Sequence, residues 1–168
     1  MKTWKILTLI SGVILLVSNG CGPKMPEGVP PLHPTKVIVL NGGSPVDKAN
    51  VFFVKQSGDT GSWSVGNSTD STGVATIQTT QGEWKGVGAP EGEYKVYITK
   101  MPDVQEDPLP PGSDSDALEK AQNAYLKKLA AAPKIVPEKL TSTKTTPLTI
   151  SVKPGSTTEL TVEVSEYK

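Results

Sequence analysis

The feature that most constrains the fold is a series of short segments in which apolar and polar residues alternate. The clearest runs over 92–99, where Tyr94, Val96 and Ile98 fall at every second position. A period of two places these three side chains on one face of a β-strand, and the residues between them on the other. The segment therefore predicts a strand with one buried face.

Similar segments recur along the chain, and each is closed by a turn rich in Gly, Pro, Asn or Asp. They cover 36–40, 50–55, 63–67, 74–79, 148–152 and 158–164. Seven short strands in about 130 residues, separated by such turns, are typical of a β-sandwich or barrel. We therefore predict an all-β fold of about seven strands.

One segment departs from this pattern. Residues 102–133 begin acidic and rich in proline, and 114–132 then become helical in character. Four residues fall on one face at helical spacing: Leu118, Ala121, Tyr125 and Leu129. Asp116 and Glu119 are spaced as a capping pair, and Pro133 ends the helix. We expect a helical insertion lying on the sandwich, and the alternative is a frayed surface helix inside a long loop.

The N-terminus has the order of residue types that marks an exported protein. Two lysines precede an apolar run over 6–17, and small residues at 18–20 lead to Cys21, the only cysteine. This order is typical of a secretory signal peptide, and the apolar run is shorter than the ~18 residues of a membrane-spanning helix. Residues 17–21 resemble the bacterial lipobox, whose cysteine is acylated.

This resemblance predicts a lipoprotein with a signal peptide over 1–20 and an acyl chain such as palmitate on Cys21. Five prolines between residues 22 and 35 predict an extended tether over 21–35, with the sandwich over 36–168. The expected location is the cell envelope, lipid-anchored and facing the periplasm or the cell exterior. The residue after Cys21 is Gly22, whereas many lipoproteins that are retained in the inner membrane have aspartate at this position. The glycine therefore favours the outer membrane.

Composition argues against several classes of function. Without residues 1–20, the chain keeps 15 lysines, 17 acidic residues and no arginine, so nucleic acid is not an expected partner. A single histidine, His33, and no cysteine beyond Cys21 leave too few groups for a zinc site or for nucleophilic catalysis. Acidic residues between 103 and 116 lack the spacing of a calcium loop. We expect no metal, no cofactor, no catalytic residue and no enzyme activity.

The order of the turns and strands resembles a known family. The matching stretches are 41–53, 68–77 with its Thr-Asp-x-x-Gly turn, 89–98 with its Pro-x-Gly-x-Tyr start, 135–140 and 146–155. Together they resemble the carboxypeptidase regulatory-like, transthyretin-like domains of small bacterial lipoproteins, notably those of planctomycetes. Leu140 stands where the family usually has tyrosine. The resemblance implies an immunoglobulin-like β-sandwich that has no chemistry of its own.

Two tryptophans remain as candidate ligand contacts. Trp63 and Trp84 lie in stretches rich in Gly and Ser, where an exposed indole could stack on a sugar ring. The simpler interpretation is that each fills space in a core that has few aromatic residues. The sequence therefore predicts a lipid-anchored, non-enzymatic envelope protein whose sandwich is a structural or interaction module. The alternative is a carbohydrate-binding module that uses Trp63 or Trp84, and the partner is then a glycan rather than an envelope protein.

Overall fold

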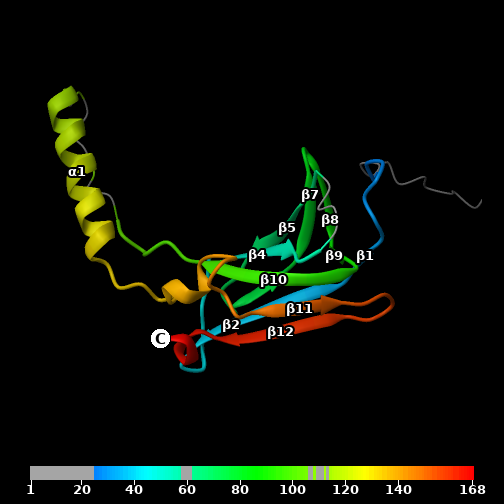
Figure 1. Cartoon of the computed structure of the whole chain (residues 1–168). Helices are drawn as coiled ribbons and strands as arrows, with labels where there is room; N and C mark the ends of the chain where they lie inside the picture. Colours follow the sequence, from blue (N-terminus) through cyan, green and yellow to red (C-terminus); the bar gives the residue numbers. More distant parts are fainter. Residues whose placement is uncertain (1–24, 58–61, 106–107, 109–111, 113) are drawn as a thin grey trace, which may run out of the picture.

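The computed structural model describes residues 25–57, 62–105, 108, 112 and 114–168. Its larger sheet is antiparallel and has six strands in the order β11 (Thr149–Val152), β10 (Gly92–Thr99), β4 (Asn50–Lys55), β5 (Ser64–Ser68), β7 (Gln78–Gln81) and β8 (Trp84–Val87). The second sheet is built on β2 (Thr35–Asn41), which pairs antiparallel with β3 (Ser44–Pro45) and β6 (Val74–Thr76) and parallel with β12 (Thr158–Glu163). Figure 1 shows the two sheets packed face to face.

The core lies between these sheets because alternate residues of both point inward. From the larger sheet, Val51, Val96 and Ile98 are fully buried, and from the second sheet Val37 and Val39 are fully buried. The three inward positions expected in 92–99 are confirmed, since Tyr94 is also buried while Lys95 and Tyr97 between them are half-buried. The prediction of an all-β sandwich with one helical insertion is confirmed.

The segment 74–79, expected to be one strand, is two strands that belong to different sheets. The first, β6, pairs with β2, whereas β7 pairs with β5. Between them, the fully buried Ile77 donates its backbone N–H to Thr35 O at 3.0 Å, and its own carbonyl accepts from Gly88 N at 2.8 Å. The chain therefore crosses from one layer to the other at Ile77 without leaving a backbone group unpaired.

Residues of the expected tether take part in the fold. Residues 32–33 form β1 (Leu32–His33), which pairs antiparallel with β9 (Ala89–Pro90). Val29 is only 9% exposed, and Thr35, the first residue of β2, is 1% exposed. The end of the stretch 21–35 is therefore part of the sandwich, because even a proline-rich segment can pair where its remaining backbone groups face a partner. Cys21 and the predicted signal peptide over 1–20 lie outside the described residues.

The helix α1 (Ser115–Ala131) forms in the expected part of the sequence, but it does not pack on the sheets as expected. None of its residues is buried, and Figure 1 shows it apart from the two sheets. The expectation that it lies on the sandwich was therefore wrong. Tyr125 and Leu129 are half-buried, whereas Leu118 is 53% exposed. The expected cap was also wrong: Asp114, not Asp116, accepts the Ala117 N–H at 2.9 Å, because a capping side chain must precede the first turn.

A carboxylate at the end of β12 joins this strand to the turn between β2 and β3. Glu163, the last residue of β12, accepts the backbone N–H groups of Gly42 and Gly43 at 2.7 and 2.9 Å. The backbone N–H of Ser165 donates to the same carboxylate at 3.2 Å, and so does its hydroxyl, at 2.5 Å. The Ser165 hydroxyl and the Gly43 N–H are the main causes that lower the pKa of Glu163 to about 2. The interaction closes the β2–β3 turn against the short 3-10 helix over Val164–Tyr167.

Candidate functional site

Two aromatic rings lie on the outer face of the six-stranded sheet. In β10 and β4, Tyr97 and Phe52 are direct partners on the face opposite the core. Their rings stack with centroids 4.8 Å apart and an interplanar angle of 20°. Phe52 and its neighbour on the same face, Val54, each remain 38% exposed. The outer face thus carries an apolar surface at a position where an antiparallel sheet is usually polar.

A glycine on the next strand leaves room for the Phe52 ring. Gly66 of β5 is the register partner of Phe52, and the Phe52 ring edge lies 3.4 Å from the place a Cβ would take. That Cβ would also collide with the carbonyl oxygen of Val51, which is backbone and cannot turn away. Gly66 therefore has a packing role in addition to any effect on the strand.

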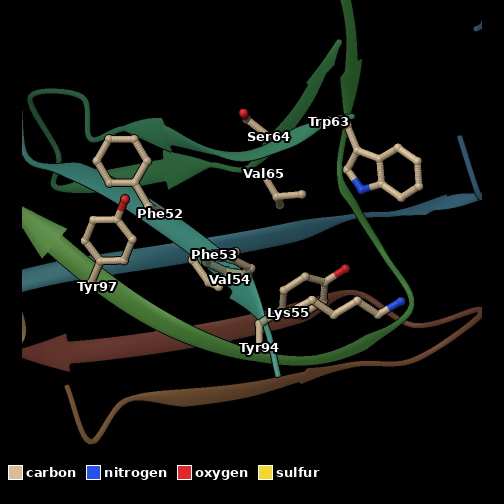
Figure 2. Close-up of a pocket in the computed structure, with 9 residues that line it drawn as sticks. All are labelled: Phe52, Phe53, Val54, Lys55, Trp63, Ser64, Val65, Tyr94 and Tyr97. Atoms are coloured by element: carbon tan, nitrogen blue, oxygen red, sulfur yellow. The ribbon is translucent and has the colours of Figure 1, made fainter. Parts of the chain in front are cut away.

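Beside the stacked rings, a pocket of about 260 Å³ opens between β4 and β5. The ladder between these strands ends at the pair Phe53 and Val65, and the residues beyond it separate (Figure 2). Nine residues line the pocket: Phe52, Phe53, Val54, Lys55, Trp63, Ser64, Val65, Tyr94 and Tyr97. It therefore joins the outer face of the sheet to the edge of the core.

The inner wall of this pocket is rigid. Phe53, Val65 and Tyr94 are all buried, and the Phe53 and Tyr94 rings contact each other with centroids 5.6 Å apart. The Tyr94 hydroxyl donates to Pro90 O at 2.9 Å, and burial raises the pKa of Tyr94 to about 12. This bond back to a residue four positions earlier is similar to the tyrosine corner of immunoglobulin-like sandwiches. A neutral, fixed Tyr94 supports the pocket.

The two tryptophans singled out by the sequence lie in different places. Trp63 lines the pocket and packs in part against the core, across the opening from Phe52 and Tyr97 in Figure 2. Trp84 lies in β8, outside the residues that line the pocket, and its ring covers Gly86. Both indoles are half-buried rather than exposed as expected. Of the two candidates, the pocket includes only Trp63.

The sequence reasoning missed Phe52 and Tyr97 as candidate contacts. Tyr97 carried a signal, because it is an aromatic residue on the face of an alternating strand that is otherwise polar. Phe52 carried a weaker one, since Phe52 and Phe53 are adjacent and the pattern does not show which of them points inward. Only the register between β4 and β10 brings the two rings together.

The acidic segment does not gather into a metal site within the described residues, where no group of three or more potential ligands occurs. Asp103 lies 3.4 Å from the amine of Lys100, whose side chain is 3% exposed and also donates to Asp47 O at 3.0 Å. Asp114 caps α1. Among all the residues that the structure describes, no helix is both long and apolar enough to cross a membrane.

Comparisons with protein-family models, with curated proteins and with solved structures found no match to this chain. The resemblance to carboxypeptidase regulatory-like domains therefore stays a prediction that rests on the sequence motifs.

Proposed function

We propose that this chain is a lipid-anchored, non-enzymatic protein of the cell envelope whose β-sandwich serves as an interaction module. The order of residue types that ends at Cys21 supports the anchor, and the scarcity of His, Cys and Arg supports a role other than catalysis. In Figure 1, β1 and α1 lie at opposite ends of the sandwich. A tether at Cys21 would hold the β1 end nearest the membrane and leave the outer face of the larger sheet accessible.

The observation that carries the interaction module is the stacked pair of Phe52 and Tyr97 on that outer face. A monomeric protein usually keeps such rings in its core, and an exposed apolar patch beside a pocket commonly marks a binding surface. The patch continues through Val54 into the pocket that Trp63 lines.

The anchor is tested by replacing the thiol that would accept the lipid. Cys21→Ser should abolish incorporation of labelled palmitate and move the protein from the membrane fraction to the soluble fraction. The matched control is Ser18→Ala, which changes a small residue before the cysteine and should leave both properties unchanged. Palmitate that persists in the Cys21→Ser variant would contradict the proposed anchor.

The interaction module is tested by oxidative footprinting of its aromatic residues. With envelope fragments added to the purified protein, Trp63, Tyr97 and Phe52 should be oxidised several-fold more slowly than in buffer alone. Trp84 serves as the internal reference, because it lies outside the pocket. If all four residues are oxidised at the same rates with and without envelope fragments, this face is not a binding surface.

A further inference from the structure

We propose that the pocket between β4 and β5 binds a glycan, with the face of one sugar ring against Phe52 and Tyr97. This inference rests on the proposed function, since it names the ligand of the same surface. The site is larger than the tryptophan contact expected from the sequence: it consists of the stacked pair, Trp63 and the polar groups between them, and Trp84 is not part of it.

The shape of the aromatic surface suits a sugar. The Phe52 and Tyr97 rings are within 20° of parallel with centroids 4.8 Å apart, so each ring covers part of the other, and the part of Phe52 that stays exposed offers an apolar aromatic surface. A pyranose presents an apolar face of C–H groups and a rim of hydroxyls. Such a ligand can bury one face on aromatic rings while its rim stays hydrogen-bonded to water or protein.

A peptide strand is a poorer fit to this place. Addition of a strand requires a free sheet edge, and β4 lies between β10 and β5 with its backbone paired on both sides as far as Phe53. A ligand here must therefore be recognised through side chains. A sugar needs no backbone partner, whereas an extended peptide would leave its own N–H and C=O groups without sheet partners.

The polar groups around the pocket are few and free to bind. The side-chain hydroxyls of Ser64 and Tyr97 form no hydrogen bond with any described residue, and Lys55 forms no ion pair with one. Among the described residues that line the pocket, Lys55 is also the only charged one. In Figure 2 the Lys55 amine lies on the Trp63 side of the pocket, and a single amine there favours a sugar with one carboxylate, so we expect a uronic acid to bind more tightly than a neutral hexose.

The test uses the full chain in detergent with Trp4→Phe and Trp84→Phe, so that Trp63 is the only tryptophan and reports on the pocket. The probes are cellohexaose, the hexamer of N-acetylglucosamine and hexagalacturonate, titrated by fluorescence and calorimetry. Hexagalacturonate should shift the emission of Trp63 and bind most tightly. Lys55→Gln should reduce its affinity to that of the neutral hexamers.

Substitutions on the outer face then locate the site. Phe52→Ser should weaken binding at least about tenfold, which corresponds to ~1.4 kcal/mol, and Tyr97→Ser should act in the same direction. The matched control is Val87→Ser, which removes an exposed apolar residue, 64% exposed, from β8 of the same sheet but outside the pocket. Thermal unfolding of each variant shows whether it is folded.

Two results would overturn the glycan inference. One is a folded wild-type chain that binds none of the three hexamers, and the other is an equal loss of affinity in the Val87→Ser and Phe52→Ser variants. Neither result removes the proposed function if envelope fragments still protect Trp63 from oxidation, because the surface would then bind a ligand of another class. Absence of that protection would instead contradict the proposed function itself.

Discussion

Removal of the helical insertion should leave the sandwich intact. The change we consider replaces residues 104–133 by a four-residue Gly/Ser linker, which keeps Asp103 beside Lys100 and keeps Val136 in the core. No residue of α1 is buried, so the deletion removes almost no apolar packing. We expect a folded protein with a single cooperative unfolding transition.

The expected change in the free energy of unfolding is the sum of two opposing contributions. The connection between β10 and the 3-10 helix at Glu138–Leu140 falls from 38 residues, over 100–137, to 12. Because each halving of a loop lowers the closure cost by ~0.6 kcal/mol, the shorter connection stabilises the fold by about 1 kcal/mol. The half-buried Tyr125 and Leu129 are lost, and the partial burial of these two side chains contributes about 1–2 kcal/mol. The free energy of unfolding should therefore change by less than about 1 kcal/mol.

Urea unfolding followed by circular dichroism measures both the free energy of unfolding and its slope. The slope should change little, because it follows the surface exposed on unfolding and α1 is already exposed. The matched control is Val136→Ala, a residue just beyond the insertion that is 3% exposed, whose truncation should cost about 1.6 kcal/mol. A deletion variant that loses more than about 3 kcal/mol or has no cooperative transition would refute the reasoning.

Two further predictions test the sandwich itself. Ile98→Ala should lower the free energy of unfolding by about 2–5 kcal/mol because Ile98 is fully buried, whereas Glu93→Ala, on the exposed face of the same strand, should cost under about 0.5 kcal/mol by urea unfolding. Equal losses would contradict the register of β10. The pKa of Glu163 is lowered from 4.5 to about 2, so its contribution to stability is complete above about pH 4.5 and is lost as the pH falls toward 2. Glu163→Gln should therefore flatten the acid dependence of the melting temperature in this range, and an unchanged pH profile would show that the carboxylate has no such role.

The local alternation of apolar and polar residues was enough to predict the strands that bury one face, because that face fixes their register. The strand expected over 92–99 coincides with β10, because slipping it by one residue would expose Val96 and Ile98. The change of sheet at Ile77 was not predictable, since the alternation in 74–79 continues unbroken across it. Sheet membership depends on which distant strand lies alongside, and that is not a local property.

The candidate site was predictable only in part for the same reason. Trp63 was recognised by its residue type, and the outward position of Tyr97 followed from alternation. The pairing of Tyr97 with Phe52 depends on the register between strands that are about 45 residues apart, which no local pattern specifies. The strand that holds Trp84 was missed because it contains Gly86 and is flanked by Gly82 and Gly88, and glycine has low strand propensity.

The parallel pairing of β2 with β12 has a mechanical consequence. These are the first and last long strands of the described residues, and six consecutive residue pairs join them, from Thr35 with Thr158 to Leu40 with Glu163. A pull between the N-terminus and the C-terminus would draw them in opposite directions along their length. All the hydrogen bonds of the ladder would then bear the load together in shear, rather than open one after another. If the chain is tethered at Cys21, tension applied through its C-terminal end loads the β2–β12 ladder in shear, the direction in which the sandwich resists unfolding most.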